Sequence, residues 1–181
     1  MKQMIETERL ILRPFEAEDL DIIYKIYSDE EILRYSPYDP MDREQARALL
    51  EEMLREWQKP EPGNREMAVI RKDTGEKIGR CHMLYEPEKD SVMLGWFLKK
   101  EAWGKGYATE IGEALLDCCF EELKVHRVWG LCNPANTASR RVMEKCGMRP
   151  EGHFREKCRY EKKGKVTWED EMEYTILASD R

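Results

Sequence analysis

The sequence predicts an α+β fold in which a mixed, mostly antiparallel sheet has helices on both faces. Three short strand-like segments lie between residues 67 and 98 with short polar turns between them, as in an antiparallel meander. Four other segments carry apolar residues at helical spacing. The expected order of elements is β-α-α-β-β-β-α-β-α-β-β, a mixed α/β arrangement.

Length and composition indicate one domain spanning residues 1–181, because the chain has no repeat, linker or low-complexity segment. Hydrophobic residues make up 41% and charged residues 38%, which is typical of a globular protein. No apolar run reaches the roughly 20 residues that cross a bilayer, and the N-terminus lacks the apolar core of a signal peptide. We therefore expect a cytoplasmic protein without a membrane partner. The net charge of −6 argues against nucleic acid and favours cationic substrates.

The six cysteines form no Cys-x-x-Cys pair. In a reducing compartment such residues act as small buried hydrophobes. We therefore expect neither a disulfide framework nor a metal site. The cysteines are Cys81, Cys118, Cys119, Cys132, Cys146 and Cys158.

The N-terminal third contains one expected strand and two expected helices. Residues 5–15 alternate as a strand does, and residues 16–27 then change to helical spacing. After a break with two prolines, Asp42 and Gln45 form the pattern of a capping box at the start of a second helix. The apolar face of this helix comprises Ala46, Leu49, Leu50, Met53, Leu54 and Trp57.

The meander follows, with strands expected at residues 67–71, 77–85 and 91–98. A long amphipathic helix over residues 107–123 and a strand over residues 126–132 come next.

The last part of the chain contains one more expected helix and two strands. The helix covers residues 137–146, with Asn136 as its N-cap and Gly147 in the left-handed position after its end. Residues 149–177 predict two strands joined by a loop at residues 162–164.

A glycine-rich turn joins the third meander strand to the long helix. It reads Trp103-Gly104-Lys105-Gly106-Tyr107-Ala108-Thr109. A strand, such a turn and a helix leave backbone N–H groups unpaired at the helix N-terminus, where the helix dipole adds positive potential. Because such a place binds phosphate, the turn predicts a phosphorylated cofactor.

Two common phosphate motifs do not fit this turn. A P-loop needs Gly-Lys-Ser/Thr, whereas Lys105 stands between two glycines. A dinucleotide fingerprint needs a third Gly or Ala, where this chain has Thr109, and an acidic residue about 20 residues on. Residues 124–132 contain no Asp or Glu. A plain strand–helix turn, with glycines that only serve packing, is left open by the motif alone.

The turn resembles the signature of the GCN5-related N-acetyltransferases (GNAT), Gln/Arg-x-x-Gly-x-Gly/Ala, although Trp103 replaces the leading Gln/Arg. The form Trp-Gly-Lys-Gly-Tyr-Ala-Thr-Glu is similar to the branch of ribosomal-protein N-terminal alanine acetyltransferases. Two further stretches resemble that branch, Glu6-Thr-Glu-Arg-Leu-Ile-Leu-Arg13 and Asn133-Pro-Ala-Asn136-x-x-Ser139-x-x-x-Met143-Glu-Lys-x-Gly147-Met. The matches run in order from residue 6 to about residue 174, so the resemblance covers nearly the whole chain.

The resemblance implies a GNAT-type acyl-CoA N-acyltransferase fold and acetyl-coenzyme A as cosubstrate, without a metal. The pantetheine arm would lie along the splayed strand Trp96-Phe97-Leu98, and the pyrophosphate on the amides of the turn. The expected cofactor-binding residues are therefore Trp96, Phe97, Leu98, Trp103, Gly104, Lys105, Gly106, Tyr107, Ala108, Thr109, Asn133 and Asn136. The two asparagines fit turn formation and helix capping equally well.

The implied reaction is direct attack of an amine on the thioester in a ternary complex. Ser139 matches the position that some relatives use near the leaving thiolate, and it equally fits a helix residue that helps the cap. A backbone N–H of the splayed strand would stabilise the oxyanion. The resemblance does not choose the general base, for which Glu101, Glu151, Glu156 and His153 are candidates, and Tyr160 is a further candidate for the site.

The acceptor that the resemblance implies is a primary amine, on a peptide N-terminus or a small molecule. Its pocket would be built by residues 16–57 and the tail loop near Lys162. An aromatic and acidic mouth would suit a cation, and the residues concerned are Tyr24, Tyr27, Tyr35, Tyr38, Trp168, Asp29, Glu30 and Glu31. The alternative function is a non-catalytic coenzyme-A-binding sensor or interaction domain. A monomer and a homodimer are both compatible with the sequence.

Overall fold

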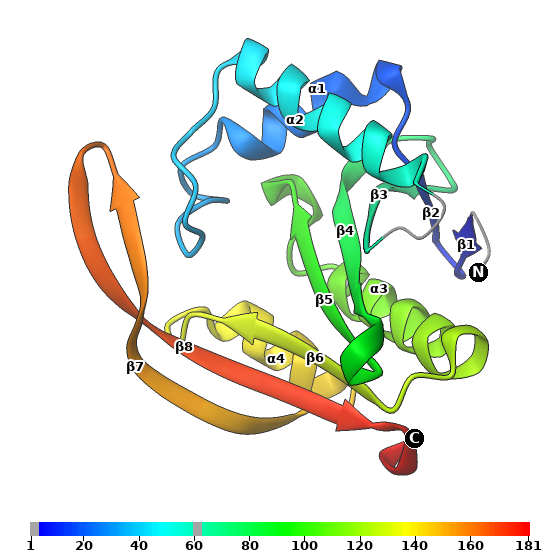
Figure 1. Ribbon diagram of the computed structural model, residues 1–181. Coiled ribbons are helices and arrows are strands. Elements are labelled where there is room, and N and C mark those ends of the chain that lie inside the picture. The colour runs from blue at the N-terminus through cyan, green and yellow to red at the C-terminus, as the bar shows by residue number, and fades with distance from the viewer. Residues whose placement is uncertain (1–3, 60–62) are drawn as a thin grey trace.

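The computed structural model describes residues 4–59 and 63–181, whose strands form one eight-stranded sheet (Figure 1). The strand order is β1-β2-β3-β4-β5-β6-β8-β7, and every neighbouring pair is antiparallel except β5 and β6. This confirms the predicted mixed, mostly antiparallel sheet. The strands are β1 (Ile5–Glu6), β2 (Leu10–Pro14), β3 (Asn64–Arg71), β4 (Lys77–Glu86), β5 (Ser91–Leu98), β6 (Arg127–Cys132), β7 (Arg149–Lys162) and β8 (Lys165–Leu177).

Helices cover both faces of the sheet, as predicted. They are α1 (Leu20–Tyr27), α2 (Arg43–Trp57), α3 (Tyr107–Asp117) and α4 (Thr137–Lys145). Successive side chains of a strand point to opposite faces, so Met67 and Val69 of β3 join the apolar cluster that contains α3 and α4, whereas Ala68 and Ile70 join the cluster under α1 and α2. The sheet therefore packs against a separate apolar core on each face. Burial of each aliphatic side chain contributes about 1.5–3 kcal/mol to the stability of the fold.

Two elements differ from the sequence prediction. Residues 5–15 were expected to be one strand, but Thr7 reverses the chain and accepts the amide of Leu10 on its hydroxyl, at 2.9 Å, so that β1 and β2 form a hairpin. The alternation continues through both strands, which hides the turn. The long helix also changes character, because α3 ends at Asp117 and continues as a π-helix over Cys118–Leu123.

The predicted helix ends are confirmed. Asp42 accepts the amides of Glu44 and Gln45 at 2.9 and 2.8 Å, and the Gln45 side chain accepts the amide of Asp42 in return. Asn136 caps α4 by accepting the amide of Ser139 at 3.1 Å. Gly147 has a φ of +81°, the left-handed conformation that ends this helix.

The strands β5 and β6 separate after a short parallel stretch (Figure 1). Their register covers only Ser91–Met93 against Arg127–Trp129. The rest of β5, residues 94–98, therefore has a strand neighbour on the β4 side alone. This open edge of β5 leads directly into the glycine-rich turn and α3.

Candidate functional site

The glycine-rich turn has the geometry of an anion site. Gly104 and Gly106 have φ values of +71° and +81°, which favour glycine, and a Cβ added at Gly104 would meet no atom within 4 Å. Gly106 is the N-cap of α3 and provides no side chain to cover the amides of the first turn. The N–H groups of the first turn are therefore not covered by a capping side chain, and together with the helix dipole they can bind a pyrophosphate.

Arg9 supports this turn, a contact that sequence reasoning missed. Its guanidinium donates to the carbonyl of Lys105 at 3.0 Å and stacks on the Tyr107 ring, 4.6 Å from its centroid. It also pairs with Glu110 at 2.6 Å, and Glu110 accepts the Thr7 hydroxyl at 2.5 Å. Although burial raises the pKa of Glu110, these hydrogen bonds outweigh burial and lower it. The β1–β2 hairpin thus holds the turn in place.

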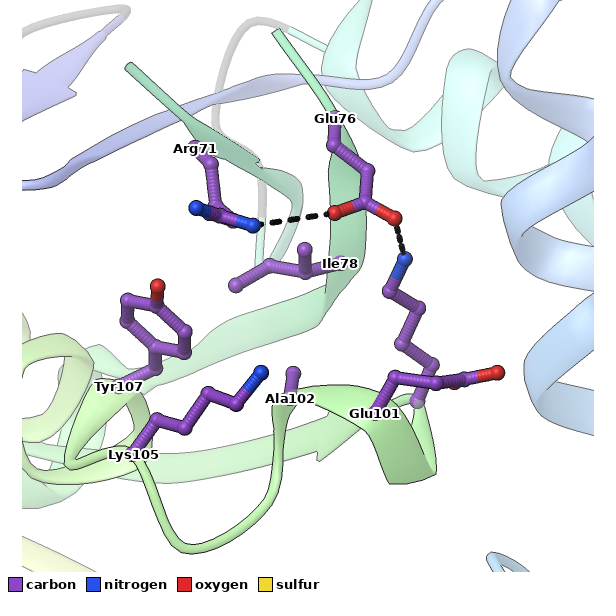
Figure 2. A pocket seen from close by; sticks show the side chains of 8 residues that line it. Arg71, Glu76, Ile78, Glu101, Ala102, Lys105 and Tyr107 are labelled. Atoms are coloured by element: carbon purple, nitrogen blue, oxygen red, sulfur yellow. Dashed lines mark hydrogen bonds and ion pairs between the residues drawn. The ribbon is translucent and has the colours of Figure 1, made fainter. Parts of the chain in front are cut away.

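The side chain of Lys105 extends towards a small cavity on the β3–β4 side of the turn (Figure 2). The cavity measures about 60 Å³, and within it Glu76 accepts from Lys99 and from Arg71. Trp103, which is 44% exposed, fastens the start of the turn by donating its indole N–H to the carbonyl of Leu98 at 2.8 Å. The lining residues are Arg71, Glu76, Ile78, Lys99, Glu101, Ala102, Lys105 and Tyr107.

The predicted pantetheine strand lies at the open edge of β5. Trp96 and the buried Leu98 pack on the α3 side of the sheet, whereas Phe97 lies on the opposite face against Tyr27, with ring centroids 6.0 Å apart. All three side chains are therefore engaged with the two cores. A ligand along this edge would therefore contact the backbone N–H and C=O groups of β5, as the predicted strand-like binding requires.

The other predicted residues lie where β6 leads into α4, with Asn133 in the connection, Asn136 as the N-cap and Ser139 on the first turn of the helix. Asn133 accepts the amide of Ala135 at 2.9 Å and donates to Glu169 of β8 at 3.3 Å. Asn136 is the helix cap, and Ser139, whose amide it holds, is half-buried. The structural roles of both asparagines are therefore present, and their contact with a cofactor stays a prediction.

The four candidates for the general base are scattered. Glu101 pairs with Lys25 at 3.2 Å, and Glu151 pairs with Arg127 at 3.0 Å, where β5 and β6 are still paired. His153 contacts Asp170 at 2.8 Å on the exposed part of β7.

The remaining candidates also lie on β7. Glu156 is exposed, with a φ of +47° and its amide bonded to Asp170 at 2.9 Å. Tyr160 is half-buried, and burial raises its pKa to about 12. Among the described residues, none of the four base candidates forms a hydrogen bond with Ser139.

The tip of the β7–β8 hairpin reaches the segment between α1 and α2 (Figure 1). Lys162 donates to the carbonyl of Leu33 at 2.9 Å, and the amide of Lys163 donates to both oxygens of Asp39 at 3.1 Å. The two regions expected to build the acceptor pocket, residues 16–57 and the tail loop, are therefore in contact.

The aromatic side chains of this region divide between core and surface. Tyr27 is fully buried and contacts Tyr38 edge-on, with ring centroids 5.4 Å apart, whereas Trp168 is 56% exposed. Tyr24 lies beneath the guanidinium of Arg43.

The acidic side chains of the same region are already paired. Asp29 and Glu31 contact Lys100 at 3.0 and 3.1 Å, and Glu30 contacts Lys163 at 2.7 Å. Their lysine partners neutralise much of the negative charge expected at the mouth.

A buried polar cluster that sequence reasoning missed lies under α1. Arg80 of β4 pairs with Glu66 of β3 at 2.9 Å, and it contacts the hydroxyl of Tyr27 and, at 2.7 Å, Nδ1 of His82. Arg80 and Glu66 are almost fully buried, whereas His82 is only partly so. Their place in one cluster follows from the pairing of β3 with β4, which the composition of either strand does not reveal.

The described residues form neither a metal-ligand cluster nor a membrane-spanning helix. Within residues 4–59 and 63–181, no three or more His, Cys, Asp or Glu side chains are grouped so that they could hold a metal ion. The helices of the same described ranges are all too short or too polar to cross a membrane.

Comparison with known proteins identifies the family. The model of an acetyltransferase (GNAT) domain matches residues 9–149. The chain is 34% identical over 177 residues to the uncharacterized N-acetyltransferase YnaD of Bacillus subtilis (strain 168), covering 97% of this chain and 98% of that protein. It is 33% identical over 167 residues to the uncharacterized N-acetyltransferase p20 of Bacillus licheniformis, covering 91% of each.

Solved structures show the same fold. The acetyltransferase (GNAT family) from Bacillus anthracis superposes with a TM-score of 0.83 at 32% identity, over 97% of this chain and 99% of that chain. Spermidine N-acetyltransferase from Vibrio cholerae, in complex with CoA and spermine, gives a TM-score of 0.80 over 96% and 98% of the two chains. At 21% identity the latter shows likeness of fold alone. The chain belongs to the GNAT family of acetyltransferases and is an acetyl-coenzyme-A-dependent N-acyltransferase.

Proposed function

We propose that the chain, acting as one cytoplasmic domain over residues 1–181, transfers the acetyl group of acetyl-coenzyme A to a primary amine in a ternary complex. The observation that carries this proposal is the parting of β5 and β6 beside the uncapped N-terminus of α3. The open edge of β5 offers backbone groups to an extended amide-bearing arm, and the 104–109 turn offers amides to its pyrophosphate. Both features lie on one continuous piece of chain, so one ligand can engage them together.

The chemistry then follows from the acyl donor and the acceptor. The nitrogen lone pair of the amine forms a bond to the thioester carbonyl carbon, and the carbon–sulfur bond breaks with its electron pair on sulfur. In this proposal the amine loses its proton to a water molecule. Ser139, on the first turn of α4, donates a hydrogen bond to the leaving sulfur in this proposal.

The acceptor is proposed as a slender cationic amine, on a small molecule or at a peptide N-terminus. The contact between the β7–β8 tip and the α1–α2 segment supports a restricted approach to the open edge of β5. The net charge of −6 favours cations at longer range.

The direct test measures release of free coenzyme A thiol by the full chain. Acetyl-coenzyme A would be supplied with a panel of polyamines such as spermine, amino acids and peptides with a free N-terminus. Transfer to one class of amine, confirmed by the mass of its acetylated product, is the expected result. Tight binding of acetyl-coenzyme A with no product over the whole panel would instead support the coenzyme-A-binding sensor. The same experiment with propionyl-coenzyme A measures selectivity for the acyl group.

A further inference from the structure

The His82 ring occupies space that exists only because β5 has glycine at the opposing position. His82 of β4 is paired with Gly95 of β5 in the sheet register. A Cβ built on Gly95 would lie 2.2 Å from Cε1 and 2.7 Å from Nε2 of the imidazole. The edge of the ring therefore lies over the backbone of Gly95. This residue belongs to residues 94–98, the open edge where the acyl donor is proposed to bind.

The contact with Arg80 decides which nitrogen of His82 carries the proton. A guanidinium has donors and no acceptor, so the 2.7 Å contact from Arg80 Nη2 makes Nδ1 the acceptor. The remaining proton of the neutral ring then sits on Nε2, the nitrogen that lies over Gly95.

The surroundings keep the ring neutral. Arg80 of β4 contacts the ring, and Glu66 of β3 is the partner of His82 in the sheet register. Arg80 in turn contacts Glu66 and the hydroxyl of Tyr27, which packs against Tyr38. Burial, with a smaller contribution from the charge of Arg80, lowers the pKa of His82 to about 3. Glu66 balances the charge of Arg80, and a neutral imidazole does not repel a cationic amine that approaches the same edge.

We propose that the Nε2–H of His82 donates a hydrogen bond to the carbonyl oxygen of the thioester bound at Gly95, and so stabilises the oxyanion formed during acetyl transfer. This rests on the proposed function. As the amine adds, the carbonyl π electrons move to oxygen; as the intermediate collapses, they return and the electron pair of the carbon–sulfur bond leaves with sulfur. His82 neither gains nor loses a proton, and Arg80 acts through it as a positioning residue.

Steady-state kinetics test the role of His82. Removing one oxyanion donor lowers kcat about 100-fold, so His82→Ala is expected to do this with little change in KM for acetyl-coenzyme A. His82→Gln, which offers an amide N–H of similar reach, should recover part of kcat. The matched control is His126→Ala, an exposed histidine just before β6, with unchanged kcat. Thermal unfolding identifies variants that fold; full kcat in a folded His82→Ala protein would overturn the proposal.

The Gly95 contact supplies a second, independent variant. Gly95→Ala must displace the imidazole, so it should lower kcat as His82→Ala does. In the double variant no ring remains to be displaced, and the Gly95 substitution should then have no further effect. Losses that multiply would show that the glycine acts without His82 and would contradict the mechanism.

Nitrogen NMR of the imidazoles provides a readout that does not depend on turnover. The three histidine signals are assigned with His126 and His153 variants. His82 is expected to show the Nε2–H tautomer without titration between pH 5 and pH 9, and to shift with acetyl-coenzyme A but not with coenzyme A. An Nδ1–H tautomer, or a bound thioester that leaves the signal unchanged, would overturn the role of His82 alone. Binding without transfer to any amine would contradict the proposed function, and absence of binding would contradict both.

Discussion

At the scale of single residues, Ser139 is the predicted side chain whose structural and chemical roles can be separated. Its amide is held by Asn136, and this bond remains in an alanine variant. A hydrogen bond to a charged group contributes about 1.5–3 kcal/mol, so Ser139→Ala should lower kcat about 10- to 100-fold. Affinity for acetyl-coenzyme A and the melting temperature should hardly change. Thr137→Ala, on the same helix turn, is the control; equal kcat in both variants would remove Ser139 from the reaction.

The residues that sequence reasoning found and missed differ in a physical way. Asn136 and Ser139 stand in a local pattern, since a cap and its helix are adjacent in the chain. Arg9 and His82 act through partners on other strands and turns, the carbonyl of Lys105 and the backbone of Gly95. No spacing along the chain encodes such contacts, and the histidine candidate drawn from the tail, His153, lies on the exposed surface.

At the scale of elements, the geometry of the turn before α3 predicts how substitution of Gly106 affects cofactor binding. A Cβ on Gly106 meets only the guanidinium of Arg9, at 3.5 Å, so the fold has room for a side chain. The left-handed φ of +81° costs a non-glycine residue about 1–2 kcal/mol. In Gly106→Val the branched side chain also obstructs the approach of a pyrophosphate. Affinity for acetyl-coenzyme A, measured by calorimetry, should fall at least about tenfold.

Gly164 is the matched control for this effect. It has a φ of +73° at the tip of the β7–β8 hairpin, with no atom within 4 Å of an added Cβ. Gly164→Val should carry similar strain and leave affinity for acetyl-coenzyme A unchanged. A folded Gly106→Val protein that binds acetyl-coenzyme A normally would show that the phosphate lies elsewhere.

The start of α1 depends on a buried carboxylate. Asp19 is fully buried and accepts from Arg13 at 2.7 Å, from Lys77 at 2.5 Å and from the amide of Glu16 at 2.8 Å. Burial raises the pKa of Asp19, but these hydrogen bonds outweigh burial and hold it below its ordinary value. The interaction therefore stabilises the fold above the unfolded pKa of about 3.9, and the stability is lost as pH falls through the lower folded value.

Replacement of this carboxylate has a defined pH dependence. Removing one partner of a buried pair costs about 3 kcal/mol, so Asp19→Asn should lower the free energy of unfolding by about this amount at pH 7. The difference from the unsubstituted protein should shrink below pH 4, where the unfolded carboxylate becomes protonated, and should vanish as pH falls through the lower folded pKa. Urea unfolding at the two pH values measures it. Asp21→Asn, at an exposed carboxylate paired with Arg43, is the control and should show little effect at either pH.

The boundaries of elements were predicted where a local signal exists and missed where it does not. The capping box at Asp42 and the glycine after α4 mark helix ends in the sequence itself. The break between β1 and β2 lies inside an alternating pattern, and the change from α3 to a π-helix keeps an apolar face throughout. The periodicity of apolar residues indicates which face of a helix is buried, but it does not distinguish an α-helix from a short π-helix.

At the scale of the whole molecule, the β7–β8 hairpin and the α1–α2 segment are joined at their tips. Lys163 supplies this link through its amide to Asp39 and its ammonium to Glu30. Lys163→Glu places a negative charge beside two carboxylates and should loosen the link. The KM for the acceptor amine is expected to rise about two- to fivefold, in line with an exposed ion pair. The KM for acetyl-coenzyme A should stay unchanged.

Lys165→Glu, an equal change of charge on the exposed start of β8, distinguishes this link from a general electrostatic effect. An equal rise of KM in both variants would indicate attraction of the amine by net charge alone. A rise in the Lys163 variant only would support a positioned tip.

The fold class could be predicted because each layer has its own periodicity, at 2 residues in the meander and 3.6 in the helices. The parting of β5 and β6 could not, since it depends on pairing between segments more than 30 residues apart. The resemblance to the GNAT family supplied that feature as an expectation. The resemblance also led us to expect residues 16–57 and the tail loop side by side, but no pattern in the sequence specified the individual hydrogen bonds of Leu33 and Asp39 with the hairpin tip.

The buried cysteines all lie in the apolar cluster on the α3 and α4 side of the sheet, and this has a practical consequence for measurements of the protein over time. None of the six cysteines is in a disulfide, and five are buried. Burial raises the pKa of Cys146 to about 12 and that of Cys132 to about 11, so little thiolate exists at neutral pH. An alkylating reagent can modify such groups only while the molecule is transiently open. The rate at which the buried thiols are labelled therefore measures how often this core opens, and the native chain needs no added probe.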